Sequence, residues 1–306
     1  MDYRNYIFIR SDANDYISKN INLSGFTVIS PYSKIALSNP IFRKIMRFHL
    51  NSIFPFKSIW YNKKVINKRI NENSVVVAFE SGINTHFFKH FTRKYKTTKK
   101  FLWFWNTVDN TISPLSKDLS DWKLYSFSEV DCFLYQMIFN PAPYFSNNSN
   151  GEKFTIKYDV CFVGKDKNRL KKLLLIKSFL EINGYKCKFL ITENSRRLFK
   201  SKKLSRNIKY SETINLLLES KAILDYIIPA NSGLSMRAME SLFFSKKLIT
   251  NNPLIKNYDF YNSDNIFILG VDHPDTFKKF MEISYNHDVD IYKQNYTFER
   301  WLSRFL

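Results

Sequence analysis

The sequence predicts an α/β protein made of two doubly wound, Rossmann-like domains. Its 306 residues suffice for two domains of roughly 150 residues each. Short apolar runs alternate with longer helix-like segments in both halves, as in parallel sheets joined by crossover helices. Asn140–Lys153 is rich in Pro, Asn, Ser and Gly, which suits a linker. We therefore expect a domain over 1–145, a domain over 154–285 and a closing helix over 286–306.

Five short runs of β-branched and aromatic residues in the first half predict strands, because polar residues bound each of them. They are Tyr6–Ile9, Thr27–Ile29, Ser74–Phe79, Phe101–Trp105 and Lys123–Phe127. Longer mixed segments between these runs favour helices, among them Pro40–Phe54 and Asn84–Tyr95. This order is typical of a parallel sheet whose strands are joined by crossovers.

The alternation continues in the second half, after the linker. Its predicted strands are Lys157–Val163, Cys187–Ile191, Ala222–Ile228, Lys247–Thr250 and Ile266–Leu269, and its predicted helices are Arg169–Asn183, Ser211–Ser220 and Ser235–Phe244. Gly184 follows the first of these helices and suits a left-handed C-terminal cap. The apolar positions of Tyr292–Leu306 fit an amphipathic closing helix.

The composition excludes several classes of protein. Seven Gly and nine Pro are too few for a collagenous or low-complexity chain. Three cysteines without a CxxC pair indicate a reducing compartment rather than a disulfide framework. We find no N-terminal apolar segment of signal-peptide length, and no apolar run approaches the roughly 18 to 20 residues that span a bilayer. We therefore expect a cytoplasmic protein, at most held on a membrane surface.

Positive charge is concentrated in the first half. Lys and Arg number 47 against 27 Asp and Glu, a formal net charge of +20, which implies an anionic partner. No acidic residue lies between Asp15 and Glu72 or from Ser81 to Val108. The basic residues of the first stretch alternate with Phe42, Met46, Phe48, Phe54, Phe56, Trp60 and Tyr61. This mixture suits an anionic membrane surface or single-stranded nucleic acid, and a solvated lysine-rich surface over an ordinary core is the alternative.

Glu80 directly follows the run Ser74–Phe79 and precedes Ser81-Gly82. The carboxyl ends of strands face the ligand crevice of an open α/β sheet. A carboxylate there is positioned to accept a proton from an acceptor hydroxyl. We therefore predict Glu80 as a catalytic base, with a helix cap or a structural salt bridge as its alternative role.

The segment Ile223–Asn252 predicts a site for a pyrophosphate group. A strand, a polar loop and a helix start follow one another in it, and a helix start exposes free backbone N–H groups and the positive end of the helix dipole. Gly233 allows the backbone to approach a phosphate closely, and Arg237 in the first helical turn adds a charge-assisted contact. The residues predicted for this crevice are Asp225, Asn231, Ser232, Gly233, Leu234, Ser235, Arg237, Thr250 and Asn251.

Two further features extend this crevice. Glu240 lies one turn after Arg237, where a carboxylate can accept hydrogen bonds from both hydroxyls of a ribose. Gly164 ends a predicted strand, and Lys165, Lys167 and Arg169 follow it as a second phosphate cradle. The local sequence matches neither G-x-x-x-x-G-K-[ST] nor G-x-G-x-x-G, which argues against a P-loop hydrolase and a dinucleotide-dependent dehydrogenase.

The same residues resemble a known family. A strand to an Asp, a G-L-[ST]-M-R-x-x-E helix and a K-x-[IL]-[IT]-T-N strand resemble the donor-binding domain of GT-B-type glycosyltransferases, in particular the bacterial enzymes of lipopolysaccharide, O-antigen and capsular polysaccharide assembly. YDVCFVGKDKNR (158–169), FLWFWN (101–106), YSFSEVDCFLY (125–135) and NYDFYNSDNIFIL (257–269) fit the same family. The likeness covers 101–269 and is most specific in the second half. Ser128-Glu129 departs from the SFD pattern of the family.

The resemblance implies a GT-B fold and metal-independent transfer of a sugar from a nucleotide-activated donor in the C-terminal domain to an acceptor in the N-terminal domain. It implies that Glu240 contacts ribose or sugar hydroxyls. It also implies a diphosphate site lined by Gly164, Lys165, Arg169, Ser235 and Arg237. The residues then expected at the acceptor are Trp103, Trp105 and Asn106.

The expected partners follow from the same resemblance. The nucleotide-sugar is a substrate, and no further cofactor is expected. The expected acceptor is an oligosaccharide or a lipid-linked glycan of the bacterial surface, and the anionic inner face of the cytoplasmic membrane is the expected place of work. No nucleic acid partner is expected.

The sequence leaves alternatives open for both the reaction and the function. An inverting transfer needs a base such as Glu80, whereas a retaining enzyme can use the leaving phosphate. A glycosyltransferase-like subunit without catalysis would bind the donor without turnover. A single-stranded nucleic-acid-binding protein would explain the charge, although no HTH, RRM, KH or OB signature supports it.

No metal site is expected from the sequence. Asp288-Val289-Asp290 formally matches a DxD motif but lies near the C-terminus between predicted helices, so we expect a surface loop. His86 and His90 have i, i+4 spacing and can share a helix face. Without a third ligand, this pair favours a core or surface role over zinc binding.

Overall fold

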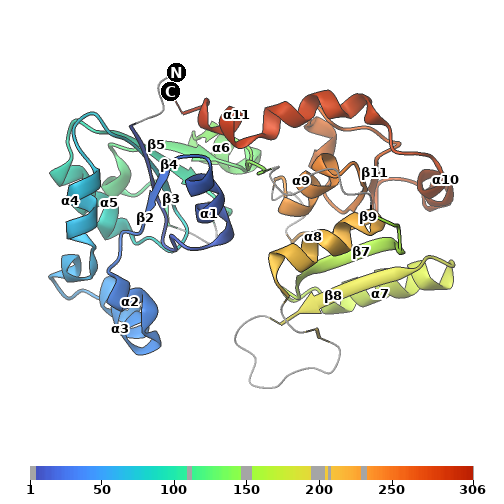
Figure 1. The fold of residues 1–306 in the computed structure, drawn as a ribbon, viewed down its shortest axis with the longest axis horizontal. Helices are drawn as coiled ribbons and strands as arrows, with labels where there is room; N and C mark the ends of the chain where they lie inside the picture. Colours follow the sequence, from blue (N-terminus) through green and yellow to red (C-terminus); the bar gives the residue numbers. More distant parts are fainter. Residues whose placement is uncertain are drawn as a thin grey trace. The chain divides into compact units, whose positions relative to one another are not determined.

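The computed structural model describes residues 5–108, 112–145, 154–193, 204–205, 208–228 and 233–305. The chain forms two compact units, the first of which extends to Pro141 and includes Phe305, while the second comprises Ala142–Arg304. Each unit is built around one parallel β-sheet with helices packed beside it (Figure 1). Within the described ranges, no helix is long and apolar enough to cross a lipid bilayer.

The sheet of the first unit has the order β2-β1-β3-β4-β5-β6, and every neighbouring pair is parallel. Its strands are β1 (Tyr6–Ile9), β2 (Thr27–Ile29), β3 (Val75–Phe79), β4 (Lys99–Phe104), β5 (Lys123–Ser126) and β6 (Ile138–Phe139). The central strands are almost wholly buried, as expected for a sheet covered on both faces. Because β2 and β3 lie on opposite sides of β1, the strand order reverses between β1 and β3.

The helices of the first unit connect these strands. They are α1 (Tyr16–Leu23), α2 (Lys34–Ser38), α3 (Pro40–Asn51), α4 (Lys63–Arg69), α5 (Thr85–Lys94) and α6 (Glu129–Tyr135), with 3-10 turns at Lys57–Trp60 and Lys117–Leu119. Asp15 caps α1, Asn39 caps α3 and Asn84 caps α5, each by accepting a hydrogen bond from a free backbone N–H of the first turn. These caps fix where each helix leaves the edge of the sheet.

The sheet of the second unit has the order β11-β10-β9-β7-β8 and is also parallel throughout. Its strands are β7 (Tyr158–Lys165), β8 (Cys187–Thr192), β9 (Ser220–Asp225), β10 (Lys247–Thr250) and β11 (Ile266–Ile268). Its helices are α7 (Leu170–Ile182), α8 (Tyr210–Leu218), α9 (Met236–Phe243), α10 (Phe277–Glu282) and α11 (Phe298–Leu302), with 3-10 segments at Pro253–Asn257, Pro274–Thr276 and His287–Tyr296. The strand order reverses between β7 and β9.

The closing segment differs from the single helix expected over Tyr292–Leu306. It consists of the 3-10 segment His287–Tyr296 and the short helix α11. The Tyr296 carbonyl accepts a hydrogen bond from the Tyr144 N–H at 2.8 Å and so leaves the helical ladder. The backbone is extended at the next residue, Thr297, which then caps α11.

The DxD-like segment Asp288-Val289-Asp290 belongs to this 3-10 segment and is not the expected loop. Val289 is buried in the second unit, and the Asp290 carboxylate pairs with the Lys293 ammonium at 2.8 Å. Asp288 is exposed. The buried valine and the ion pair therefore explain this segment structurally.

Phe305 packs the end of the chain into the first unit. Its ring is 1% exposed, with its centroid 5.7 Å from that of Phe101 and 4.7 Å from that of Tyr125. Phe305→Ala should lower the free energy of unfolding by about 3 to 5 kcal/mol, the cost of removing a buried phenylalanine. Urea unfolding measures this change.

Ile291→Ala is the control for this substitution, because Ile291 is 64% exposed. It should change stability by no more than about 0.5 kcal/mol. Equal stability of the two variants would contradict the packing of Phe305.

Candidate functional site

The candidate site of the second unit lies at the carboxyl ends of its parallel strands. The point where the strand order reverses, between β7 and β9, is where open α/β sheets bind ligands. Lys165 ends β7, Asp225 ends β9 and Thr250 ends β10. The fold thus brings three of the predicted residues to one edge of the sheet.

The turn after β7 is held by Asp166. Its N–H donates to the Thr192 carbonyl at 2.8 Å, and its carboxylate accepts from the Leu170 N–H at 2.7 Å at the start of α7. Lys167 and Asn168 lie between these bonds with φ of 45° and 63°. Residues with side chains rarely adopt this left-handed conformation, and it is concentrated at functional sites.

Arg169 is buried at the base of this turn. Its guanidinium lies 5.2 Å from the centroid of the Phe162 ring and donates to the Lys165 carbonyl at 3.2 and 3.3 Å. A Cβ added to Gly164 would lie 3.1 Å from the Phe162 ring and 3.2 Å from the Arg169 guanidinium, so glycine fits this packing best. Arg169 therefore shapes the turn, whereas Lys165 and Lys167 are exposed on it.

Lys167 lies among the other cations of the turn. Partial burial lowers the pKa of the Lys167 ammonium, and the charges of Arg169 and Lys165 lower it further. Burial also lowers the pKa of the Arg169 guanidinium, an effect that Asp225 and Asp166 oppose. Because crowded cations are stabilised by an anion, this edge of the sheet favours a negatively charged ligand.

Ser235 fixes the start of α9. Its hydroxyl accepts from the Ala238 N–H at 3.1 Å, and its side chain is hydrogen-bonded to the buried carboxylate of Asp225. Burial raises the pKa of the Asp225 carboxyl, and the hydrogen bond to Ser235 together with the charges of Arg169 and Arg237 opposes this rise. Asp225 thus joins the end of β9 to the first turn of α9.

Thr250 and Asn251 shape the crevice through hydrogen bonds within the protein. Thr250 is buried, and its hydroxyl accepts from the Asn252 N–H at 3.1 Å. Asn251 binds the backbone of Ile227 twice, accepting from its N–H at 2.7 Å and donating to its carbonyl at 2.8 Å. The Gly233 carbonyl, at a residue with φ of 82°, accepts from the Asn252 side chain at 3.2 Å. Of the other predicted residues, Leu234 is buried, and Asn231 and Ser232 lie outside the described residues.

Glu240 is fully buried, and both of its carboxylate oxygens have partners. The Tyr210 hydroxyl donates to one oxygen at 2.7 Å, and the Arg237 guanidinium pairs with the other. Arg237 also donates from Nε to the Val163 carbonyl of β7 at 3.1 Å. This network links α9 to α8 and β7. The predicted contact of Glu240 with donor hydroxyls would have to share or exchange one of these bonds.

Glu80 is buried at the end of β3. Its carboxylate accepts from the Trp105 N–H at 2.9 Å and from the Asn106 side-chain amide at 2.7 Å. Burial raises the pKa of the Glu80 carboxyl, and these hydrogen bonds oppose the rise. The contacts tie the end of β3 to the segment after β4. Action as a base would use a lone pair that these donors leave available.

The three residues expected at the acceptor differ in exposure. Trp103 is fully buried in the first unit, and its indole N–H donates to the Asn140 carbonyl at 2.9 Å, so its ring belongs to the core. Trp105 and Asn106 are half-buried. Neither composition nor spacing distinguishes the buried tryptophan from its half-buried neighbour.

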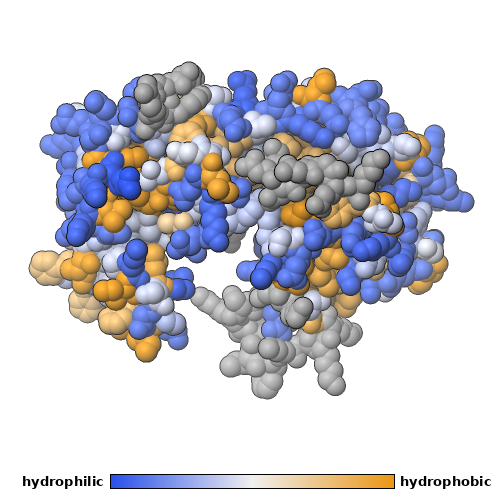
Figure 2. Space-filling model, in the orientation of Figure 1, coloured by the Kyte–Doolittle hydropathy of each residue, from blue (hydrophilic) through white to orange (hydrophobic). Residues whose placement is uncertain are grey.

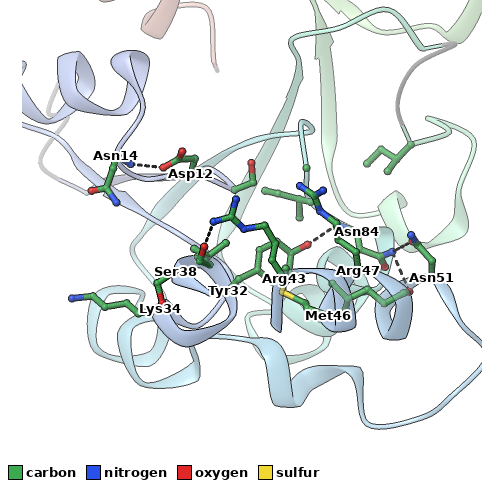
Figure 3. A pocket seen from close by; sticks show the side chains of 16 residues that line it. Asp12, Asn14, Tyr32, Lys34, Ser38, Arg43, Met46, Arg47, Asn51 and Asn84 are labelled. Carbon is green, nitrogen blue, oxygen red and sulfur yellow. Dashed lines mark hydrogen bonds between the residues drawn. The ribbon is translucent and has the colours of Figure 1, made fainter. Parts of the chain in front are cut away.

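Sequence reasoning does not find a pocket of about 960 Å³ in the first unit. The pocket lies where the strand order reverses, with Asp12 following β1 and Asn84 following β3 (Figure 3). Lys34, Arg43 and Arg47, from α2 and α3, also line it. The long stretch without acidic residues supplies these cations, but the sequence alone cannot show that they surround a cavity.

Tyr32 and Gly82 shape the wall of this pocket. The Tyr32 hydroxyl accepts from the Asn84 N–H at 3.0 Å, and burial raises the pKa of Tyr32 to about 12. Gly82 has φ of 72°, and a Cβ there would lie 2.7 Å from the Ser11 hydroxyl. Glycine therefore lets the loops after β1 and β3 approach each other.

His86 and His90 lie on α5 beside Tyr61. His86 Nδ1 is hydrogen-bonded to the Tyr61 hydroxyl at 2.9 Å, and the centroid of the His90 ring is 5.3 Å from that of Tyr61. Burial lowers the pKa of both imidazoles. In the part of the chain that the structure describes, no group of three or more His, Cys, Asp or Glu side chains is placed to hold a metal ion.

Known proteins resemble this chain in structure. No protein-family model and no curated protein sequence matches it. The crystal structure of TarM is similar with a TM-score of 0.46 and 13% identity, over 79% of this chain and 54% of that chain. A structure of the GtfA/B complex is similar with a TM-score of 0.45 and 10% identity, over 74% of this chain and 55% of that chain. This chain therefore spans about half the length of those two chains.

A further structure matches over nearly the full length of both chains. It is the DNA modifying enzyme β-glucosyltransferase in the presence and absence of the substrate uridine diphosphoglucose, with a TM-score of 0.51 and 10% identity, over 98% of this chain and 95% of that chain. At this identity the likeness shows the fold. The two-domain GT-B fold expected from the sequence is thus confirmed.

Glu80→Gln should change the pH dependence of stability. Because the pKa of Glu80 is raised in the folded protein, its protonated form favours folding at low pH. That contribution is lost as the pH rises from about 4.3, the ordinary pKa of glutamate, through the raised value. The melting temperature of the unaltered protein minus that of Glu80→Gln should therefore fall as the pH rises from about 4 to 7.

Glu72→Gln removes the same charge from an exposed position in the same unit and is the control. It should move the melting temperature little at any pH in this range. A difference for Glu80→Gln that stays constant with pH, or rises, would contradict the effect of burial on this carboxyl.

Proposed function

We propose that the protein is a glycosyltransferase that moves a sugar from a nucleotide-activated donor to an acceptor. The donor diphosphate binds at the carboxyl edge of the second unit's sheet. The observation that carries this proposal is the group of cations at the end of β7, where Lys165 and Lys167 are exposed beside the buried Arg169, and where burial and the charges of Arg169 and Lys165 lower the pKa of Lys167. The start of α9 adds backbone N–H groups. The GT-B fold supports the reaction class, and the β-glucosyltransferase that shares it uses uridine diphosphoglucose.

The chemistry follows from these groups. Transfer breaks the bond between the anomeric carbon and a diphosphate oxygen, and the electron pair stays on that oxygen. The ammonium groups of Lys165 and Lys167 and the N–H groups of α9 stabilise the developing charge. The acceptor hydroxyl forms the new bond to the anomeric carbon and loses its proton. In an inverting reaction we assign that proton to Glu80, and in a retaining reaction to the leaving diphosphate.

The donor's ribose is assigned to the buried network around Glu240. A carboxylate can accept hydrogen bonds from both ribose hydroxyls, and each oxygen has more than one lone pair. Tyr210 and Arg237 hold the carboxylate in one orientation. Arg237 in turn is anchored to β7 at Val163. Binding of a ribose would therefore be coupled to the strand that ends in the cation-rich turn.

The proposed acceptor is a glycan of the bacterial surface, of the lipopolysaccharide, O-antigen or capsule kind, carried as an oligosaccharide or on a lipid. The resemblance over 101–269 to enzymes of that assembly motivates this choice. The pocket of the first unit, lined by Lys34, Arg43 and Arg47, suits an acceptor that bears phosphate or carboxylate groups. Such an enzyme would work at the inner face of the cytoplasmic membrane.

Lys165→Ala/Lys167→Ala should weaken binding of the donor nucleotide. The nucleotide is first chosen by calorimetry among UDP, GDP, CDP and CMP. Its dissociation constant should then rise at least about 100-fold, because charge-assisted hydrogen bonds contribute about 1.5 to 3 kcal/mol each and the variant removes two of them. Both lysines are exposed, so the variant should keep its fold.

Lys171→Ala/Lys172→Ala removes the same charge from exposed positions on α7 and is the matched control. Its dissociation constant should stay within about twofold of the unaltered value. The donor site would be wrong if no nucleotide binds, or if both double variants weaken binding equally. If the protein binds a nucleotide-sugar but releases no nucleoside diphosphate when acceptor extracts are added, the non-catalytic subunit is favoured instead.

We also propose that transfer needs no divalent metal, because the lysines and the helix start can neutralise the diphosphate. Addition of EDTA should leave the dissociation constant of the nucleotide, and any turnover, within about twofold of the value in magnesium or manganese. The same calorimetric titration measures this. A loss of about tenfold or more in EDTA would show that a metal bridges the diphosphate.

A further inference from the structure

The first unit exposes a set of large apolar side chains on α3 and the segments beside it, which we call the α3 surface. The set consists of Ile35, Ile41, Phe42, Ile45, Phe48, Ile53, Phe54, Phe56 and Ile59. Ile53 is 98% exposed, Phe56 78% and Phe48 71%. Figure 2 shows hydrophobic side chains gathered at the lower left, over α2 and α3 of Figure 1. Single exposed apolar residues are common, but a contiguous set marks an interaction site.

Helix α3 has two different faces. The face that lines the pocket has i, i+3, i+4, i+7 spacing and consists of Arg43, Met46, Arg47 and Leu50. The opposite face has i, i+4, i+7 spacing and consists of the exposed residues Ile41, Ile45 and Phe48. Of the twelve residues of α3, Met46 and Leu50 are buried. The helix is therefore attached to its unit by a narrow stripe and turns its broad apolar face outward.

Cations border the α3 surface, and no carboxylate of the surrounding sequence interrupts it. Lys44 is exposed on α3 beside the outward face, and Lys57 begins the 3-10 turn that follows, whereas Lys34, Arg43 and Arg47 line the pocket on the other side of the helix. No Asp or Glu occurs from residue 16 to residue 71. Apolar side chains beside positive charge, in a stretch of sequence without acidic residues, fit a partner that is both apolar and anionic.

We propose that the α3 surface docks the protein on the anionic face of a lipid bilayer. The outward isoleucines and phenylalanines enter the boundary between headgroups and acyl chains, and the flanking cations contact headgroup phosphates. Docking itself stands on the exposed side chains and their charge. Its consequence for catalysis rests on the proposed function: α3 also lines the pocket, so a lipid-carried acceptor with an anionic headgroup would arrive beside Arg43 and Arg47.

Other occupants fit the α3 surface less well. A second copy of this chain would bring two identical cationic surfaces together, which like charges oppose. Nucleic acid would neutralise the cations and could stack its bases on the four phenylalanines, but it would leave the five isoleucines of the surface without an apolar partner. An anionic bilayer satisfies the charge and the apolar side chains at once.

Vesicle flotation tests the proposal with the full-length protein. Vesicles of phosphatidylcholine containing about 30% phosphatidylglycerol should bind at least about tenfold more protein than pure phosphatidylcholine at low salt, and high salt should reduce this preference. Phe48→Ser/Phe56→Ser should lower binding at least about tenfold. Leu175→Ser/Ile182→Ser, which changes two exposed apolar residues of α7, is the control and should stay within about twofold.

Further readouts separate this proposal from its rivals and from the proposed function. The dissociation constant for the nucleotide should be unchanged in Phe48→Ser/Phe56→Ser, and Lys165→Ala/Lys167→Ala should bind vesicles as the unaltered protein does. In analytical sedimentation, Phe48→Ser/Phe56→Ser should have the same oligomeric state as the unaltered protein. The proposal is overturned if the unaltered protein does not bind the anionic vesicles, if Phe48→Ser/Phe56→Ser binds them equally well, or if that variant instead loses a dimer or binding to single-stranded DNA.

Discussion

Buried carboxylates organise the edges of both sheets, because a buried charge must be hydrogen-bonded or paired. Glu80 draws in the segment after β4 through Trp105 and Asn106. Asp225 fixes the start of α9 through Ser235, and Glu240 ties α9 to α8 and, through Arg237, to β7. Each carboxylate satisfies donors that would otherwise be unpaired, and so it fixes a loop or a helix start at the place where the fold offers a ligand site.

This arrangement separates residues that shape the candidate site of the second unit from residues that can touch a ligand. The guanidiniums of Arg169 and Arg237 donate to backbone carbonyls within the unit. Lys165 and Lys167 are exposed beyond them. Arginine presents a rigid fork that suits a fixed structural contact, whereas lysine offers a compact charge on a flexible stem. The buried arginines therefore set the backbone, and the exposed lysines are the residues proposed to contact a diphosphate, a division of roles consistent with the chemistry of each side chain.

The sequence predicts the parallel strands because runs such as Val75–Phe79 are apolar on both faces. It does not predict α1, whose buried face includes Ser18 and Asn20, because their hydrogen bonds to Arg10 and to the Tyr16 carbonyl compensate their polarity only in the folded chain. Nor does it predict the break before Thr297, which depends on a bond from a residue far away in the sequence. Periodicity reports neighbours along the helix or strand and is silent about such distant partners.

The same limit separates the two candidate sites. In the second unit, the cations and the helix start follow one another along the chain, so a motif can predict their chemistry. In the first unit, one stretch of alternating cations and apolar residues has Phe48 exposed but Met46 and Tyr61 buried. Helical spacing allows either face of α3 to point inward. The polar pocket determines which face of α3 points inward, because Arg43 and Arg47 line it. The opposite face, with its isoleucines and phenylalanine, is therefore turned away from the unit.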